Sequence, residues 1–297
     1  MRKAPLRVKI LRHLWAKNDA KRDAGLVEPE GMVIDRDISY GKYKKYNLLD
    51  VYRPSADKKL PVIVNIHGGG YFYGSKDLYR YYCMELAGHG FAVVNFNYRL
   101  SPEFQFPAAL EDINKVFLWI EENFSKYNLD VDNLFVIGDS AGAQLTSHYA
   151  TILTNKEFAD KFKLEKHNIK IKAVSMACGM YDIAKRFESG KDMRIMKDYL
   201  GKNFDKTDER YIPMKYMTKD FPPAFIFSAE NDFLNEECEP MYNFLKEKGV
   251  YTKMQIFGTK EEKEIAHVFH ENIRHPEAKK ANQMQIDFFG DVSGLRQ

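Results

Sequence analysis

Residues 138–142 read G-D-S-A-G and place a serine between two glycines, a spacing that suits nucleophilic catalysis. A serine hydroxyl becomes a good nucleophile only when a base takes its proton, and it must project from the backbone to reach that base. The G-x-S-x-G pattern does this where a strand turns sharply into a helix, because the glycines lack a Cβ atom. An apolar run precedes the motif and a helical pattern follows it. We therefore predict that Ser140 is a nucleophile; a plain tight turn is the alternative.

A glycine-rich loop upstream could stabilise the negative charge that acyl transfer builds on the former carbonyl oxygen. Residues 67–70 read H-G-G-G and follow an apolar strand pattern. Glycines let the backbone N–H groups approach that oxygen closely. The N–H group of Ala141, at the start of a helix, is a further expected donor. We expect structural roles for His67, which would fix the loop, and for Asp139, which would form hydrogen bonds.

The acid of a catalytic triad is expected beyond Ser140, in the chain order Ser, Asp, His. Asp232 directly follows the apolar run at 224–228 and is the favoured acid. Asp182 also follows an apolar run and is the main rival. Its position suits capping of a helix that begins near Ile183.

The base should be a histidine beyond Asp232 that this acid can orient. His267 follows the last apolar run of the chain and precedes a closing helical pattern. His270 and His275 are the alternatives, and we interpret them as surface residues because charged residues surround them. The sequence therefore favours His267 as the base.

Short apolar runs alternate with amphipathic stretches along the 297 residues, which predicts one domain with a parallel sheet covered by helices on both faces. In such sheets, ligands bind at the carboxyl ends of the strands, where the motifs above lie. The expected strands are 33–40, 46–53, 61–66, 91–96, 133–137, 171–176, 224–228 and 251–257. The expected helices are 78–88, 107–122, 141–154, 240–248 and 278–289.

Residues 183–221 interrupt the alternation with several helical stretches and no strand. We interpret this segment, together with approximately residues 1–30, as a small helical cap over the strand ends; an ordinary surface excursion is the alternative. Methionine and aromatic side chains predict a small apolar pocket for short acyl chains. The expected lining residues are Tyr71, Phe72, Met193, Met196 and Met214.

Near the start of the chain, Val8, Leu11, Leu14 and Trp15 fall on one helical face. We expect this face to dock on the protein's own body; docking on a membrane surface is the alternative. No apolar run approaches ~20 residues, so no stable membrane insertion is expected. Basic residues also interrupt any signal-peptide core.

The charge and the cysteines narrow the classes of function. The chain has 45 basic and 42 acidic residues, a net charge of +3 that does not indicate a nucleic-acid partner. Its three cysteines form no C-x-x-C pair, so we expect neither a disulfide framework nor a metal site, and a cytoplasmic location fits best. No nucleotide-binding fingerprint is present, and no cofactor is expected.

Taken together, H-G-G-G, G-D-S-A-G, N-Y-R-L-S-P-E at 97–103 and F-P-A-A-L-E-D at 106–112 resemble the hormone-sensitive-lipase-like family of carboxylesterases. The resemblance covers roughly residues 45–290. It implies an α/β-hydrolase fold with a mostly parallel eight-stranded sheet, and oxyanion donors from Gly69, Gly70 and Ala141. Two departures affect the shape of the pocket: A-Q at 143–144, where Gly and Asn are common, and H-V-F at 267–269 in place of H-G-F.

The same resemblance implies a serine carboxylesterase and a chain that can form a homodimer. Together with the small apolar pocket predicted above, we expect hydrolysis of short-chain, small-molecule esters through an acyl-enzyme intermediate. Three other functions stay open. An amidase such as an arylformamidase, or an esterase of acetylated sugars, would use the same triad. A non-catalytic hydrolase-like binding protein would lack one of the triad residues.

Overall fold

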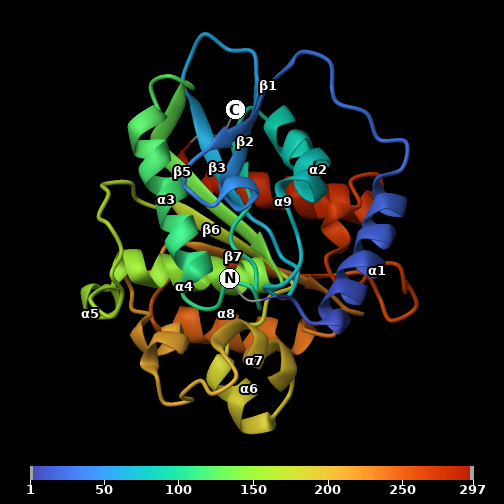
Figure 1. Ribbon diagram of the computed structural model, residues 1–297. Helices are drawn as coiled ribbons and strands as arrows, with labels where there is room; N and C mark the ends of the chain where they lie inside the picture. Colours follow the sequence, from blue (N-terminus) through green and yellow to red (C-terminus); the bar gives the residue numbers. More distant parts are fainter. Residues whose placement is uncertain (1–2, 295–297) are drawn as a thin grey trace.

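A computed structural model describes residues 3–294 and contains one eight-stranded sheet, drawn in Figure 1. The strand order is β1-β2-β4-β3-β5-β6-β7-β8. The pairs β1–β2 and β2–β4 are antiparallel, and all other pairs are parallel. The predicted α/β-hydrolase architecture is therefore confirmed. The strands are β1 (Met32–Ser39), β2 (Leu48–Pro54), β3 (Leu60–Ile66), β4 (Ala92–Phe96), β5 (Leu129–Asp139), β6 (Ala173–Ala177), β7 (Ala224–Ala229) and β8 (Thr252–Phe257).

Helices cover both faces of this sheet, as the alternating pattern predicts (Figure 1). One face carries α2 (Lys76–Gly88) and α9 (Pro276–Ser293), and the other carries α3 (Ala108–Asn123), α4 (Ala141–Thr154) and α8 (Cys238–Glu247). The remaining helices are α1 (Leu6–Asp23), α5 (Lys156–Ala159), α6 (Ile183–Ser189) and α7 (Met193–Leu200). Short 3₁₀ turns are η1 (Lys44–Asn47), η2 (Glu209–Tyr211), η3 (Pro213–Tyr216), η4 (Asn235–Glu237) and η5 (Phe269–Glu271).

Two hydrophobic cores lie on the two faces because successive side chains of a strand point to opposite sides. In β5, Val136 belongs to the core under α3, α4 and α8, whereas Phe135 and Ile137 belong to the core under α2 and α9. All three side chains are almost completely buried. A strand buried on both faces therefore has no polar alternation, which is why the central strands appear in the sequence as continuous apolar runs.

Among the strand boundaries, the start of β5 differs most from the sequence-based expectation. The strand β5 begins at Leu129 rather than at 133, because Leu129 pairs with Leu60 at the start of β3. Asp130 and Asp132 lie in this extension, and such polar residues do not signal a strand. The backbone pairing, and not side-chain burial, continues the strand there.

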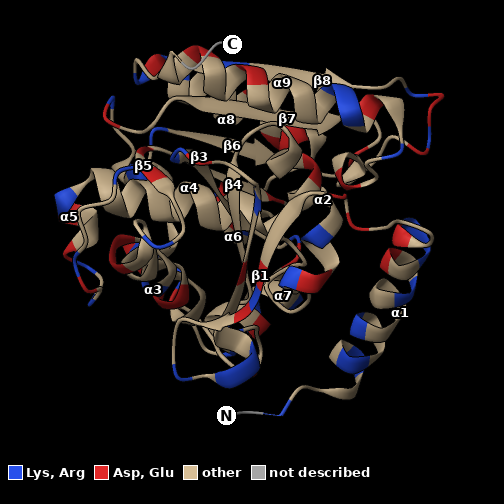
Figure 2. Ribbon diagram, turned by 90° about the horizontal axis from the view of Figure 1, so that it is seen from above, with Lys and Arg blue, Asp and Glu red and all other residues tan. Residues whose placement is uncertain are grey.

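The helix α1 lies at the edge of the molecule and is attached through one side (Figure 2). Val8 is fully buried, whereas Leu14 is 50% exposed. The prediction that Leu14 faces inward is therefore wrong. Leu14 points outward, because the contacts of α1 with the rest of the protein are largely charged. Arg7 pairs with Asp198 of α7 at 2.5 Å.

None of the helices within residues 3–294 combines the length and apolar character that crossing a membrane requires. The three cysteines, Cys83, Cys178 and Cys238, are buried and free.

Candidate active site

Ser140 occupies a sharp turn between the end of β5 and the start of α4. Its backbone has φ 51° and ψ −117°, a left-handed conformation that a non-glycine residue adopts only where its surroundings impose it. A Cβ atom on Gly138 would run into the carbonyl of Gly142, and one on Gly142 would run into the carbonyl of Ile66. The glycines are therefore required so that α4 can approach β3 and β5, and this close approach holds the Ser140 side chain in its strained position.

The structure brings Ser140, His267 and Asp232 together at the carboxyl ends of the strands. Oγ of Ser140 lies 3.0 Å from Nε2 of His267. Nδ1 of the same ring lies 2.8 Å from Oδ1 of Asp232. Asp232 follows β7, and His267 lies in the loop between β8 and η5. The predicted order of the three residues along the chain thus produces one continuous line of hydrogen bonds.

The carboxylate of Asp232 is held by several donors besides the imidazole. Ser228 donates its hydroxyl to Oδ2 at 2.5 Å, and the Leu234 N–H donates to Oδ1 at 2.9 Å. Burial alone would raise the pKa of Asp232, but His267 and these other donors together hold that pKa below its ordinary value. An ionised carboxylate only accepts hydrogen bonds, so Nδ1 carries the ring proton and Nε2 is free to accept from Ser140.

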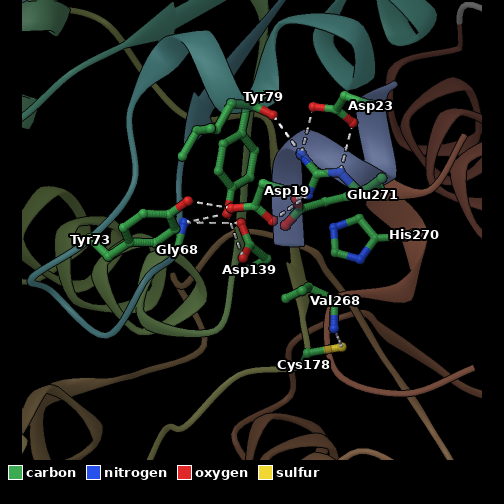
Figure 3. A network of polar contacts seen from close by, with 12 residues as sticks. Asp19, Asp23, Gly68, Tyr73, Tyr79, Asp139, Cys178, Val268, His270 and Glu271 are labelled. Carbon is green, nitrogen blue, oxygen red and sulfur yellow. Dashed lines mark hydrogen bonds and ion pairs between the residues drawn. The ribbon is translucent and has the colours of Figure 1, made fainter. Parts of the chain in front are cut away.

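The backbone of the His267 loop is also constrained. Val268 has φ 55°, which is unusual for a β-branched residue. Its N–H group donates to the thiol of Cys178 at 3.4 Å, and Figure 3 shows this contact. Burial raises the pKa of the Cys178 thiol well above its ordinary value, so the thiol stays neutral. The loop is therefore fixed immediately beside His267.

The glycine loop after β3 lies beside Ser140. The Gly68 N–H group donates to Oδ1 of Asp139 at 3.1 Å and to the Tyr79 hydroxyl at 2.9 Å. Gly69 and Gly70 have φ of 104° and 57°, and their N–H groups have no acceptor among residues 3–294. Together with Ala141, the first residue of α4, both glycines line the same pocket as Ser140.

His67 has the structural role that the sequence predicts. Its ring is fully buried and stacks on Tyr98 with centroids 4.2 Å apart. Burial lowers its pKa to about 4, so the ring is neutral near pH 7. The Tyr98 hydroxyl also donates to the His67 carbonyl at 2.8 Å. These contacts fix the start of the glycine loop.

Comparison with known proteins identifies the family. The BD-FAE family model matches residues 49–240. The chain belongs to the BD-FAE family. Versiconal hemiacetal acetate esterase of Dothistroma septosporum is 32% identical over 238 residues, which cover 74% of this chain and 70% of that protein. Ethyl acetate hydrolase of Pseudomonas putida is 28% identical over 218 residues, which cover 69% of this chain and 67% of that enzyme.

A solved structure shows the same fold over nearly the whole chain. The crystal structure of esterase B from Lactobacillus rhamnosis superposes with a TM-score of 0.87 at 23% identity, and covers 97% of this chain and 96% of that one. The fold is therefore that of an α/β-hydrolase. Together with the esterase relatives described above, the family match shows that this BD-FAE family member is a carboxylic ester hydrolase.

A pocket of about 450 Å³ opens onto Ser140. Tyr71 and Met196 line it as predicted, but Phe72, Met193 and Met214 do not. Phe72 instead packs against Trp15 of α1, with ring centroids 4.9 Å apart, and the two methionines pack against the core. The sequence does not reveal which way these side chains turn. Lining residues that we did not predict include Trp15, Asn18 and Asp19 of α1, Met180, Asp192, Ile195, and Phe233 and Leu234.

A larger open groove of about 1330 Å³ lies at the opposite ends of the strands. Its lining includes Phe91 and Thr252, which stand at the amino ends of β4 and β8. It contains none of Ser140, His267 and Asp232. The smaller pocket is therefore the candidate active site.

A buried pair of carboxyl groups, Asp139 and Glu271, is drawn in Figure 3, and both residues line the same pocket as Ser140. Asp139 accepts a hydrogen bond from the Tyr79 hydroxyl at 2.9 Å, and Glu271 forms an ion pair with Arg22 of α1. Burial raises the pKa of Asp139 to about 7 and that of Glu271 to about 8, while Arg22 opposes both shifts. This network joins α1 to the glycine loop. No sequence motif indicates this network, since single charged residues in an N-terminal helix are typical of a surface.

The rival residues have other roles. Oδ1 of Asp182 accepts from the Lys185 N–H at 2.9 Å and caps α6, as the sequence predicts. His275 caps α9 by accepting from the Glu277 N–H. Our interpretation of His270 as a surface residue is wrong. Its ring is buried between Tyr82 and Phe227, and burial lowers its pKa to about 3.

Two groups of side chains have the ligand types and spacing that a metal ion needs: Cys178 with Asp232 and His267, and Asp139 with His270 and Glu271. In the first group, Asp232 and His267 already bind each other. In the second group, Glu271 already contacts the guanidinium group of Arg22. Neither arrangement favours a metal over the partners present.

Proposed function

We propose that this chain is a serine carboxylesterase that hydrolyses short-chain acyl esters through Ser140, His267 and Asp232. The line of two hydrogen bonds, 3.0 Å from Ser140 to His267 and 2.8 Å from His267 to Asp232, carries the proposal. It ends in a pocket that a small ester can enter. This is the arrangement in which a serine gains a base and the base gains an orienting acid.

The reaction has two halves. Nε2 of His267 takes the hydroxyl proton as Oγ of Ser140 attacks the ester carbonyl carbon, and the carbonyl oxygen becomes an oxyanion. His267 then gives the proton to the leaving alcohol, and the acyl group stays on Ser140. Water, deprotonated by His267, attacks this acyl-enzyme. His267 then returns that proton to Oγ of Ser140 as the bond between Oγ and the acyl carbon breaks and the carboxylic acid leaves.

The oxyanion would be held by the N–H groups of Gly69, Gly70 and Ala141. Gly69 and Gly70 offer N–H groups without an internal acceptor beside Ser140, and Ala141 adds the positive end of the α4 dipole. Loss of one such donor typically costs about 3 kcal/mol of transition-state stabilisation. The hydrogen bonds of Gly68 to Asp139 and Tyr79 would keep these donors aimed.

We assign the cap to residues 1–30 and 183–221. The cap would decide which esters fit, since Trp15 comes from the first segment and Ile195 and Met196 come from the second. A pocket of about 450 Å³ with these apolar walls favours acetyl to butyryl groups over long acyl chains. The names of the two relatives, an acetate esterase and an ethyl acetate hydrolase, agree with a short acyl group.

A series of p-nitrophenyl esters from two to twelve carbons tests this function. We expect the highest kcat/KM at two to four carbons and no turnover above background with Ser140→Ala. A maximum at ten carbons or longer would contradict the short-chain assignment. Faster hydrolysis of p-nitroacetanilide than of p-nitrophenyl acetate would point to an amidase instead.

A further inference from the structure

The helix α1 has two faces of different character. Its inner face binds the rest of the protein. Arg12 pairs with Glu103 at 2.6 Å and donates to the Phe72 carbonyl at 2.7 Å. Arg22 pairs with Glu271. Its outer face presents Leu6, Ile10 and Leu14, which are 73%, 51% and 50% exposed. Large apolar side chains of a helix usually pack against a core, but these three are exposed to solvent.

These three side chains form one continuous stripe. They are spaced four residues apart, and residues at this spacing lie above one another on a helix. Three of the six exposed large hydrophobic side chains in residues 3–294 belong to this stripe. Such an outward-facing apolar row is unusual for a helix that has no other element on that side.

Lysines flank the stripe, and acidic side chains are absent from that side. Lys9, Lys17 and Lys21 are exposed and, at helical spacing, lie on the side of α1 that carries Leu6, Ile10 and Leu14. Their ammonium groups form no ion pair within residues 3–294. Figure 2 shows Lys and Arg residues at several positions along α1, which lies at the edge of the molecule.

Both acids of α1 point away from this lysine side and are already paired. Asp19 accepts from the Tyr73 hydroxyl, and Asp23 binds Arg22 at 2.8 Å. The outer face is therefore both apolar and cationic, and it carries no compensating negative charge.

We propose that the outer face of α1 docks on an anionic phospholipid surface, with the helix lying in the plane of the interface. Apolar side chains would enter the headgroup boundary while the lysine stems extend to the lipid phosphates. An acidic protein surface would satisfy the lysines but not the three apolar side chains. A lipid layer satisfies both, and the inner-face arginines keep the helix on the body when it binds.

This docking would place the active-site pocket beside the lipid layer. Trp15, Asn18 and Asp19 line the pocket from the same helix. Esters that partition into the layer would therefore be concentrated near Ser140. The docking itself does not depend on the proposed reaction, because it involves none of the residues that contact substrate.

Sedimentation with phospholipid vesicles tests the proposal on the full chain. We expect at least tenfold tighter binding to vesicles of phosphatidylcholine and phosphatidylglycerol than to phosphatidylcholine alone, and weaker binding as salt rises. The variant Lys9→Glu/Lys17→Glu/Lys21→Glu should bind at least about 100-fold more weakly, since each lysine near such a surface contributes about a fivefold effect.

A matched control reverses three exposed lysines elsewhere, Lys163, Lys166 and Lys170, in the segment that follows α5. This segment lies on the opposite side of the molecule from α1 (Figure 1). The control should bind within about threefold of the unaltered chain. All variants should keep their activity on soluble p-nitrophenyl acetate within about twofold, which shows that they fold.

The apolar stripe needs its own variant, Leu6→Ser/Ile10→Ser/Leu14→Ser, which should lose about tenfold or more in vesicle binding. Three results would overturn the proposal. The unaltered chain could fail to bind anionic vesicles. Charge reversal on α1 could have no larger effect than the control. The serine variant could bind as well as the unaltered chain, which would indicate a purely electrostatic contact of the kind an acidic protein partner makes.

Discussion

Nε2 of His267 lies 3.0 Å from Oγ of Ser140, although 127 residues separate them along the chain. The parallel sheet produces this contact, because the carboxyl ends of β5 and β8 open at the same edge. The strained backbone of Ser140 and that of Val268 fix the two sides of the contact.

Replacing Asp232 with asparagine should leave the fold intact and lower kcat by about 10³–10⁴-fold. The amide would donate to Nδ1 as readily as it accepts, so the ring would lose the tautomer that lets Nε2 take the serine proton. Steady-state kinetics with p-nitrophenyl acetate measures this. Asp182→Asn is the control, since Asp182 caps α6, and its kcat should stay within about threefold. Equal losses in both variants would refute the assignment of Asp232.

Replacing Gly142 with alanine should destabilise the turn that carries Ser140. The new Cβ would run into the Ile66 carbonyl, so β3 and α4 must separate. Overpacking of this kind costs about 1–3 kcal/mol, which lowers Tm by about 3–10 °C. Gly88→Ala, where a Cβ meets nothing within 4 Å, should leave Tm unchanged or raise it slightly. Thermal unfolding measures the Tm of both variants. An unchanged Tm for Gly142→Ala would contradict the close packing of Gly142 against Ile66.

Glu271 should make stability depend on pH. Burial raises its pKa to about 8 from an ordinary value of 4.5, so between these values the folded chain keeps a proton that the unfolded chain releases. The contribution of this group to stability is therefore complete below about pH 4.5 and is lost as pH rises through about 8. Glu271→Gln cannot titrate, so the Tm of this variant minus that of the unaltered chain should rise between pH 5 and 8.5.

Each pKa unit corresponds to about 1.4 kcal/mol, or about 2–4 °C in Tm for a chain of this size. Glu264→Gln is the matched control for the loss of one glutamate, because Glu264 is exposed, and the rise of the Tm difference with pH should be larger for Glu271→Gln than for this control. If Glu271→Gln behaved like this control, Glu271 would have an ordinary pKa in the folded chain.

Replacing Met196 with alanine should lengthen the acyl chain that the pocket accepts. Met196 lines the pocket and is only 1% exposed, so its loss leaves room beside Ser140. The ratio of kcat/KM for the hexanoyl ester to that for the acetyl ester should rise at least about tenfold, since each buried methylene contributes about 0.8 kcal/mol. Met193→Ala should leave the ratio unchanged because Met193 does not line the pocket. An equal ratio in both variants would show that Met196 does not limit acyl length.

Sequence patterns identified the strands and the motifs because both depend on local rules. A strand buried on both faces must be apolar throughout, and a serine turn of this shape must have Gly138 and Gly142 beside it. His267 and Asp232 were found by their positions after successive strands. The distances among these side chains, in contrast, depend on the completed sheet.

Sequence patterns do not predict side-chain direction or long-range ion pairs. The sequence pattern predicts that Leu14 faces inward, yet the arginines of α1 decide its orientation by binding partners far along the chain, as Arg22 does with Glu271. The charged neighbours of His270 predict a surface residue, although packing between aromatic rings buries it. In both cases tertiary contacts override what the nearest residues suggest.

The central claim is that Ser140 forms the covalent intermediate, and labelling with a fluorophosphonate tests it most directly. The reagent is an electrophile that a base-activated serine attacks. Peptide mass spectrometry should find one adduct per chain, on the peptide that contains Ser140, and activity on p-nitrophenyl acetate should fall in proportion to the labelling. Ser140→Ala should not be labelled. A stoichiometric adduct on another residue, or full activity after Ser140 is labelled, would contradict the account.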